Sequence, residues 1–353
     1  MLSGGDYIID LRSDTLTKPT KEMRKAMFEA EVGDDGREDN LGRGEDPTVN
    51  RLEDIAAEVS GKKAALFCNS GAMANLIALL THCTRGDNVL LGETSHINKS
   101  EKAPFMDSFG GLIPRFFVTD PFGTPEINSI KQFIGDDEIK LLCLENTNNF
   151  MGGTCMSKEQ TKAICHVAHE HAIPVHLDGA RIFNASVYYD IPVKKLVEPV
   201  DSLMLSLSKG LGAPVGALLC GEKEFISRAR KVRKLLGGSM RQSGVVAASG
   251  ISAIQQEADR LKDDHDHAYR LANMIMNNDK IDIRIDSVQT NMIVVDVSPS
   301  GQSAETFESG LLKRGLKVKS ISDRHVRMTT YREITRDNMI RAANIINSYC
   351  DSL

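Results

Sequence analysis

The sequence predicts an α/β protein, in which a large domain built around a mainly parallel, doubly wound sheet is followed by a smaller α+β domain. After Pro47, short apolar runs typical of buried strands alternate with helical patterns. Such alternation is typical of a parallel sheet with helices on both faces. Beyond about Gly250 the lengths of the elements change. We therefore expect a large domain at 1–250, with an arm at 1–20, and a small domain at 251–353.

The first elements follow from local signals. The arm holds a short strand-like run, Ile8–Thr15, followed by a helix over 20–29. Residues 33–46 are rich in glycine and charge and lack apolar periodicity, so they form either a solvated surface loop or part of a lid or interface. A helix begins at Pro47, because proline is tolerated in a first turn, and ends at Gly61.

The alternating core and the small domain come next. The expected core strands are Ala64–Cys68, Asn88–Gly92, Lys140–Glu145, Pro174–Asp178, Ser202–Ser206 and Val215–Cys220, and the expected core helices are Gly71–Thr81 and Lys158–His171. The small domain is expected to hold a long helix, two strand-forming stretches and a final helix, at Ile251–Asn278, Thr290–Val297, Leu316–Thr330 and Thr335–Leu353. Because the carboxyl ends of parallel strands share one edge of a sheet, residues that follow the core strands should meet there.

Composition and charge argue against several classes of protein. The 353 residues are 41% apolar and 26% charged, and a net charge of −5 offers no general attraction to nucleic acid or to an anionic membrane. The seven cysteines include no CxxC pair, and we find neither a leader-like N-terminus nor a membrane-spanning run. We expect a cytoplasmic protein with reduced cysteines and with no nucleic-acid or membrane partner.

One lysine stands out in the segment Leu203–Gly221. Lys209 lies between two apolar runs and is followed by glycines and by Pro214. Desolvation lowers the proton affinity of an amine at the end of a buried strand, which makes the amine a nucleophile suited to Schiff-base chemistry with a carbonyl. The alternative is a lysine that reaches solvent. A dinucleotide-binding loop is discounted, because Pro214 leads into a strand and not into a helix.

Residues at other strand ends should lie beside Lys209. The join Ser70–Gly71–Ala72 would present backbone N–H groups at the start of a helix, which suits a phosphate, although a simple tight connection would look the same. Asp178 ends a strand and faces the same edge, with a helix cap as the alternative reading. His96 lies just past another strand end.

Further polar residues give weaker signals. Arg327, in a strand of the small domain, could lean over this edge and bind a carboxylate with two hydrogen bonds. The histidines near Cys165 do not share one face of an element, so no metal site is expected there. His265 and His267 lie on a charged helix and are expected in solvent.

With these residues collected, the chain resembles the threonine aldolase family, which are fold-type I pyridoxal-phosphate enzymes of the aromatic amino acid β-eliminating lyase group. The resemblance covers nearly the whole chain. It rests on IDLRSDT at 9–15, EDPTVNRLE at 45–53, SGAMAN at 70–75, HLDGARIFNA at 176–185, SLSKGLGAPVGALL at 206–219, GGSMRQSG at 237–244, and Arg327. It implies a three-layer large domain and a homo-oligomer, a dimer or tetramer, with active sites completed across a subunit interface.

The resemblance also implies a cofactor, a substrate and residue roles. The cofactor is pyridoxal 5′-phosphate, and the catalytic residues are Lys209, His96 and Asp178. The phosphate and ring of the cofactor are expected to contact Ser70, Gly71, Ala72, His96, Asp178, Arg181, Ser206, Lys209 and Arg241, the last of which could come from a neighbouring subunit. The substrate is expected to contact Ser13, Arg181, Arg327 and Asn148. The implied reaction cleaves threonine or allo-threonine to glycine and acetaldehyde.

Three positions depart from the family pattern. Asn148 replaces a histidine that contacts the β-hydroxyl, Arg43 stands where a tyrosine is usual, and Ala72 stands where a hydroxyl residue is common. An amide cannot act as a base near neutral pH, so that work would fall to His96 or to a water. The alternatives are a β-eliminating lyase, an aldolase for bulkier substrates such as phenylserine, and a non-catalytic descendant that only binds the cofactor.

Overall fold

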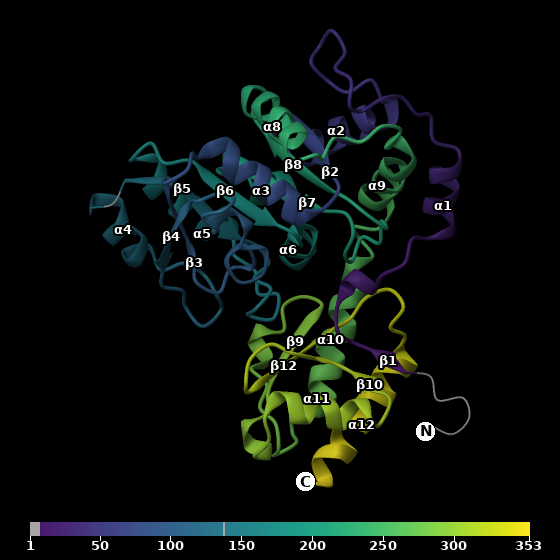
Figure 1. The fold of residues 1–353 in the computed structure, drawn as a ribbon. Coiled ribbons are helices and arrows are strands. Elements are labelled where there is room, and N and C mark those ends of the chain that lie inside the picture. Colours follow the sequence, from purple (N-terminus) through teal and green to yellow (C-terminus); the bar gives the residue numbers. More distant parts are fainter. Residues whose placement is uncertain (1–7, 137) are drawn as a thin grey trace.

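The computed structural model describes residues 8–136 and 138–353 and shows two domains (Figure 1). The large domain contains a seven-stranded sheet in the order β2-β8-β7-β6-β5-β3-β4. Its strands are β2 (Ala64–Cys68), β3 (Asn88–Gly92), β4 (Ile113–Phe117), β5 (Ile139–Glu145), β6 (Val175–Gly179), β7 (Ser202–Ser206) and β8 (Ala217–Gly221). Only β8 runs antiparallel to its neighbours among these strands, so the other strands place their carboxyl ends at one edge.

Helices cover both faces of this sheet, so the large domain has three layers. One face packs against α3 (Gly71–His82) and α8 (Lys223–Leu235). The other packs against α2 (Pro47–Ser60), α5 (Lys158–His169), α6 (Ile182–Tyr189), α7 (Val193–Leu196) and α9 (Gly244–Gln256). The remaining helices and short helical turns outside the small domain are η1 (Asp14–Leu16), α1 (Lys21–Phe28), η2 (Ile97–Glu101), η3 (Ala103–Phe105) and α4 (Ile127–Asp136).

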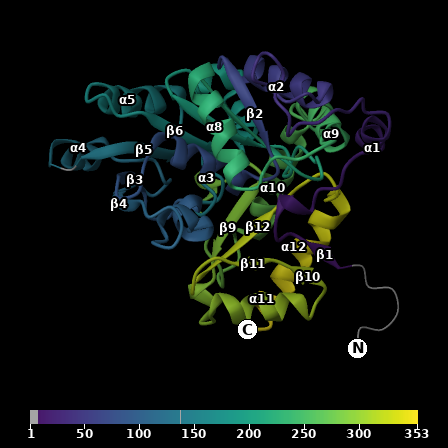
Figure 2. The ribbon, with the colours of Figure 1, turned by 45° about the horizontal axis from the view of Figure 1, so that its top comes forward.

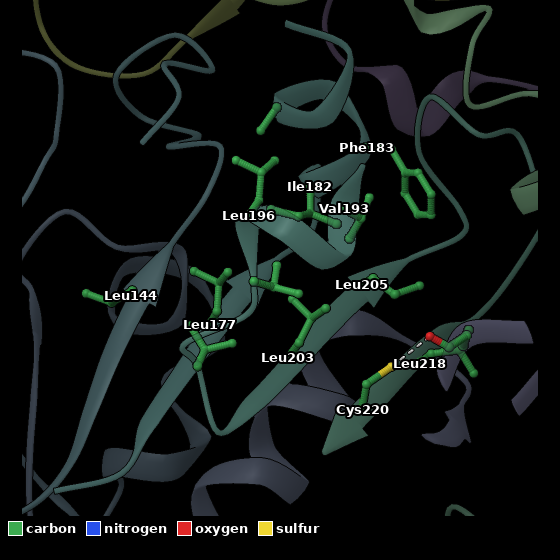
Figure 3. Close-up of a cluster of buried hydrophobic side chains, with 14 of the residues drawn as sticks. Leu144, Leu177, Ile182, Phe183, Val193, Leu196, Leu203, Leu205, Leu218 and Cys220 are labelled. Carbon is green, nitrogen blue, oxygen red and sulfur yellow. Dashed lines mark hydrogen bonds between the residues drawn. The ribbon is translucent and has the colours of Figure 1, made fainter. Parts of the chain in front are cut away.

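Side chains that alternate along each strand form two hydrophobic cores. The first core lies on the face covered by α3 and α8, and the second lies on the face covered by α2, α5, α6, α7 and α9. Leu203 and Leu205 of β7 enter the second core, whereas Met204 enters the first, because successive strand side chains point to opposite faces. Figure 3 shows the second core, in which strand leucines face Ile182 and Leu196 from the covering helices. The sheet is thus buried on both faces, as a largely parallel sheet requires.

The small domain is an α+β unit that also incorporates the N-terminal arm (Figure 2). A short sheet in the order β11-β12-β9 shares one core with three helices. The elements are α10 (Leu261–Ile275), η4 (Ile285–Ser287), β9 (Met292–Asp296), η5 (Ser298–Ser300), α11 (Ala304–Leu312), β10 (Leu316–Lys317), β11 (Lys319–Ser320), β12 (His325–Thr329) and α12 (Arg336–Asp351). In the arm, β1 (Ile9–Asp10) pairs in parallel with β10. The arm therefore crosses from the small domain to the large one.

The helices over 20–29 and from Pro47, and the core strands and helices from Ala64 onward in the large domain, are confirmed, with ends displaced by at most two residues. The strand-like run expected at Ile8–Thr15 is shorter, since only Ile9–Asp10 forms a strand. The helices and strands that were not predicted from the sequence are β4, α4, α6, α7 and α8 in the large domain and α11 in the small domain. None of the helices within 8–136 and 138–353 has both the length and the apolar character needed to cross a bilayer.

The prediction of a single long helix over 251–278 is wrong. The chain forms α9 and α10 instead and turns at 257–260. The turn is stabilised by Arg260, whose Nη2 donates a hydrogen bond of 2.9 Å to the carbonyl oxygen of Gly210. Because α9 packs on α1 and α2, the expected domain boundary at Gly250 falls inside a helix of the large domain.

Candidate active site

The carboxyl edge of the large sheet brings together residues from four strand ends. Ser70 follows β2, His96 follows β3, Asp178 lies near the end of β6, and Lys209 follows β7. A ring nitrogen of His96 and one carboxylate oxygen each of Glu101 and Asp178 lie within 4.8 Å of one another. We refer to Asn75, His96, Glu101, Asp178 and Lys209 as the cofactor cluster.

The loop that carries Lys209 turns back directly into β8, as its glycines predict. The carbonyl oxygen of Lys209 accepts a hydrogen bond of 2.8 Å from the N–H of Gly212. Gly212 and Gly216 have φ values of 81° and 113°, which are left-handed conformations that favour glycine. A Cβ on Gly216 would also lie 2.6 Å from the ring of Phe67. The tight loop therefore depends on glycine at these positions.

The amine of Lys209 is poised to lose its proton near physiological pH. Burial, assisted by the nearby guanidinium of Arg181, lowers the pKa of Lys209 to about 8. The carboxylates of Asp178, Asp14 and Glu145 act in the opposite direction on the same amine. A partly neutral amine beside an acidic group is the arrangement needed for covalent attachment of an aldehyde.

Asp178 and Glu101 are held together by one asparagine. Asp178 is 1% exposed, and its two oxygens accept hydrogen bonds of 3.0 Å each from Asn75 Nδ2 and from the N–H of Ala180. Glu101 Oε1 accepts from the same Asn75 nitrogen at 3.1 Å and from His96 Nδ1 at 3.2 Å. The hydrogen bond that His96 donates to Glu101 raises the pKa of His96. This bond leaves His96 Nε2 as the nitrogen that can exchange a proton with a ligand.

The first turn of α3 offers a site for a phosphate. Ser70 caps the helix, since its Oγ accepts a hydrogen bond of 3.2 Å from the N–H of Met73. A helix start leaves N–H groups such as those of Gly71 and Ala72 without intrahelical acceptors, next to the positive end of the dipole. Ser206 is buried at the end of the neighbouring strand β7. This join can bind an anion through its backbone alone.

Arg241 does not join this site within the described residues of the chain. Its side chain is 70% exposed and lies 3.0 Å from Asp34, in the loop at 33–46. The structure therefore places Arg241 at the surface, with loop 33–46 beside it.

A second group of residues lies where the two domains and the arm meet. We refer to Asp14, Asn149, Arg181 and Arg327 as the arginine cluster. Two hydrogen bonds of 2.7 Å join Arg181 to the buried carboxylate of Asp14. Asn149 Oδ1 accepts from Arg181 Nη1 at 3.1 Å and from Arg327 Nη1 at 2.9 Å. One carboxamide oxygen, that of Asn149, thus accepts from two guanidinium groups.

Arg327 has unused capacity to bind an anion. It is 8% exposed, and its buried Nε has no hydrogen-bond partner among the described residues. Burial and the charge of Arg181 lower the pKa of Arg327 to about 10. Buried cations without full compensation are costly, so a ligand carboxylate would be strongly favoured here. Ser13 lies beside this cluster, directly before Asp14, and caps the turn η1.

The two adjacent asparagines after β5 play different parts. Asn148 Oδ1 accepts hydrogen bonds from the N–H groups of Phe150 and Met151, at 3.2 and 3.1 Å, and so stabilises its own turn. Asn149 instead contacts both arginines. The structure therefore brings Asn149 into the arginine cluster and uses the Asn148 side-chain oxygen locally.

Glu145 lies between the two clusters. Its carboxylate accepts hydrogen bonds of 2.8 Å each from the N–H groups of His96 and Asn149. Burial and the nearby charge of Asp178 raise the pKa of Glu145 to about 7. It can therefore hold a proton near neutral pH.

Several residues of this site were not predicted from the sequence. They are Asp14, Asn75, Glu101, Glu145 and Asn149. Four of them lie in or next to segments already singled out: Asp14 and Asn75 lie in the motifs at 9–15 and 70–75, Asn149 directly follows Asn148, and Glu145 ends an expected strand. Glu101 carries no comparable signal, because it is brought to His96 by the short helical turn η2.

The expectation that His265 lies in solvent is wrong. Burial lowers its pKa to about 4, and Asn184 Nδ2 lies 3.1 Å from its Nε2. Asn184 Nδ2 also donates to Asn291 Oδ1 at 3.4 Å, and Asn291 Nδ2 donates to Asp14 at 3.2 Å. His265 thus lies in the interface between the domains. His267, expected beside it in solvent, is partly buried as well.

Comparisons with known proteins agree with this picture. A family model described as beta-eliminating lyase matches residues 10–298. A low-specificity L-threonine aldolase of Arabidopsis thaliana is 39% identical over 340 residues, covering 94% of this chain and 93% of the relative. The low specificity L-threonine aldolase of Escherichia coli (strain K12) is 39% identical over 341 residues, covering 95% and 97%.

Solved structures support the fold. A threonine aldolase of Leishmania major has a TM-score of 0.79 at 16% identity, covering 97% of this chain and 99% of that one. Serine palmitoyltransferase of Sphingomonas wittichii has a TM-score of 0.75 at 17% identity, covering 98% and 88%. The expected three-layer, fold-type I architecture is confirmed.

Proposed function

The chain belongs to the beta-eliminating lyase family, and on that premise we propose that it is a pyridoxal phosphate-dependent aldehyde-lyase that cleaves L-threonine and L-allo-threonine to glycine and acetaldehyde. The observation that carries the proposal is the pairing of the two clusters: a buried lysine with a pKa of about 8 is under the electrostatic influence of Asp178 and Arg181, and Arg181 and Arg327 are joined through Asn149. Such a pairing suits an α-amino acid, whose carboxylate and amine are recognised separately.

The residues present fit the cofactor. Lys209 would bind its aldehyde carbon, Asp178 would pair with its pyridine nitrogen, and the N–H groups of Gly71 and Ala72, with Ser70 and Ser206, would hold its phosphate. When bound, the cofactor supplies a ring that accepts electrons from a broken Cα–Cβ bond. His96 would lie against that ring, with Nε2 available.

The arginine cluster would orient the substrate. Arg181 and Arg327 bind the carboxylate, assisted by Ser13, and the free Nε of Arg327 gives a second donor on the same guanidinium. Fixing the carboxylate determines which bond at Cα stands perpendicular to the cofactor ring, and hence which bond breaks.

Removal of the β-hydroxyl proton would fall to His96 or to a water. Asn148 has no proton-accepting group of suitable basicity, and its Oδ1 is occupied by its own turn. His96 Nδ1 is bound to Glu101, so Nε2 is its exchangeable position.

The test is a substrate panel of L-threonine, L-allo-threonine and phenylserine, in which free aldehyde is assayed separately from ammonia and keto acid. We expect aldehyde and glycine from the first two. Ammonia without aldehyde would replace the proposal with a β-eliminating lyase, whereas a cofactor-loaded protein that is inactive on every substrate would indicate a non-catalytic descendant. Borohydride reduction of the loaded protein should label Lys209.

We also propose a cytoplasmic homo-oligomer, a dimer or tetramer, in which Arg241 completes the phosphate site of a neighbouring subunit. The support is that the Arg241 side chain is exposed and is oriented by Asp34. All seven cysteines are free and buried, which suits a reducing compartment. Mixing inactive Lys209→Ala and Arg241→Ala subunits should restore activity if sites are shared, and no restoration would reject the shared site.

A further inference from the structure

A line of buried polar side chains extends away from Asp178, behind the cofactor cluster. Asn75, His176 and Ser202 are 0% exposed, and His82 ends α3 with its ring stacked 4.5 Å from that of Phe225. His176 Nε2 lies 3.1 Å from Asn75 Oδ1, and His176 Nδ1 lies 2.9 Å from Ser202 Oγ. Ser202 Oγ lies 2.9 Å from His82 Nε2. The line therefore runs along α3, from its last residue back to its first turns.

The carboxylates determine how the Asn75 carboxamide is oriented. Its nitrogen lies 3.0 Å from Asp178 Oδ2 and 3.1 Å from Glu101 Oε1, and ionised carboxylates only accept hydrogen bonds. The opposite orientation would aim a carbonyl oxygen at two carboxylates. The Asn75 oxygen therefore faces His176, and His176 Nε2 must carry a hydrogen.

The direction of the remaining hydrogen bonds follows from proton counting. Burial lowers the pKa of His176 to about 3 and that of His82 to about 4, so both rings are neutral and carry one N–H each. His176 Nδ1 then has no hydrogen and must accept from the Ser202 hydroxyl. Because that hydroxyl has a single hydrogen, His82 Nε2 must donate to Ser202. Every hydrogen bond points from His82 toward Asp178.

We propose that Asn75 is a positioning residue for the proposed lyase reaction, and that His82, Ser202 and His176 hold its carboxamide in the one orientation that donates to Asp178. This inference depends on the proposed function, because Asp178 acts there by keeping the pyridine nitrogen protonated. The N–H groups of Asn75 and Ala180 each donate to one oxygen of Asp178 and so fix the orientation of this carboxylate. The second N–H of Asn75 binds Glu101 and separates the two negative groups.

The first experiment measures the dissociation constant of pyridoxal phosphate for the full-length wild type and for Asn75→Leu. Loss of hydrogen bonds to charged groups should weaken cofactor binding by about ten- to a hundredfold and lower kcat by a similar factor. KM for threonine should change by less than about twofold, because KM follows substrate binding at the arginine cluster. A dissociation constant equal to that of the wild type would reject the proposal.

A cofactor analogue separates positioning from a merely structural role. A 1-deaza analogue of pyridoxal phosphate lacks the ring nitrogen, so it cannot respond to the charge of Asp178. If Asn75 acts through Asp178, wild type and Asn75→Leu should bind this analogue equally. If Asn75→Leu binds the analogue more weakly than wild type does, Asn75 only supports the fold. This measurement requires no turnover, so it is independent of whether wild type releases aldehyde from threonine.

Variants farther along the line test the orientation itself. Ser202→Ala should weaken binding of pyridoxal phosphate by about threefold, because it removes neutral hydrogen bonds that act on Asp178 only through His176 and Asn75. Ser249→Ala is the matched control, since Ser249 is equally buried but donates only to the carbonyl oxygen of Val246 within α9. Equal dissociation constants for these two variants would overturn the role of the line. Nitrogen NMR near neutral pH should find hydrogen on Nε2 of both His176 and His82, and hydrogen on Nδ1 of His176 would contradict the proposal.

Discussion

The cofactor cluster and the arginine cluster are adjacent, but they are built in different ways. Every residue of the cofactor cluster comes from the large domain: from α3, from the short helical turn η2, or from the end of a strand of one sheet. The arginine cluster draws Asp14 from the arm, Asn149 and Arg181 from the large domain, and Arg327 from β12 of the small domain. The proposed chemistry is therefore attached to one rigid sheet, whereas substrate recognition depends on how three parts of the chain meet.

The arginine cluster is also tied to the junction by neutral side chains. Asn291 donates from the same Nδ2 to Asp14 and to the carbonyl oxygen of Thr330. Asn184 of α6 contacts both Asn291 and His265. Any change in the relative position of the domains would thus alter the arginine cluster first. If this distinction is correct, variants in the two clusters should fail in different ways.

The largest effect is expected for Arg327→Leu. Losing a buried charge that binds a carboxylate should lower kcat/KM for threonine by about a hundredfold or more, mainly through KM. The dissociation constant of pyridoxal phosphate should not change, because Arg327 lies outside the cofactor cluster. Arg324→Leu, at an exposed arginine just before the same strand, is the matched control. Loss of cofactor binding in Arg327→Leu would show that the clusters are not separate.

The next effect concerns stability. Asp14→Asn should lower the free energy of unfolding by about 3 kcal/mol, because it leaves the buried Arg181 without its carboxylate partner. Chemical denaturation of the cofactor-free chain measures this loss. An unchanged denaturation midpoint would contradict a cluster that links the arm to both domains.

The ion pair between Asp14 and Arg181 also predicts a loss of stability in acid. Burial raises the pKa of Asp14, but Arg181 outweighs this effect and lowers it to about 2. Since the pKa in the unfolded chain is about 3.9, the contribution of the pair is present above pH about 4 and is lost as the pH falls toward about 2. Thermal unfolding between these values should show a smaller pH dependence in Asp14→Asn than in wild type.

A moderate effect is expected for cofactor uptake. Burial and Arg181 lower the pKa of Lys209 to about 8, and only the neutral amine attacks an aldehyde. The rate of association of pyridoxal phosphate with cofactor-free protein should therefore rise about tenfold between pH 7 and pH 9. A midpoint near the ordinary lysine value would show that neither burial nor Arg181 lowers the pKa of Lys209.

The smallest effect compares two neighbouring residues. Asn149→Ala should raise KM for threonine about fivefold, because Arg181 and Arg327 lose a shared acceptor that aligns them. Cofactor binding should stay as in wild type. Asn148→Ala is the counterpart, for which we expect a smaller change in KM. A larger rise in KM for Asn148→Ala than for Asn149→Ala would instead support Asn148 as the substrate-binding residue that the family resemblance implies.

Much of the fold was predictable because its signals are local. Apolar runs such as Ser202–Ser206 can be buried only inside a sheet with two covered faces, and Gly61 ends a helix through its own left-handed conformation. The edge strand β4 was missed because it is partly exposed and contains Pro114. The turn at 257–260 was missed because its sequence is compatible with a helix and a distant contact, from Arg260 to Gly210, stabilises it.

By itself, the sequence determined which residues lie at strand ends, and therefore that Lys209, Asp178, His96 and the Ser70 join would share one edge of a sheet. The tertiary structure alone decided which of several chemically equal side chains became partners. Asn148 and Asn149 are adjacent and identical, yet only one reaches Arg327, which lies 178 residues away from it. The physical reason is that a hydrogen bond depends on distance and direction within a few tenths of an ångström. Sequence pattern does not specify either quantity for groups brought together from different domains.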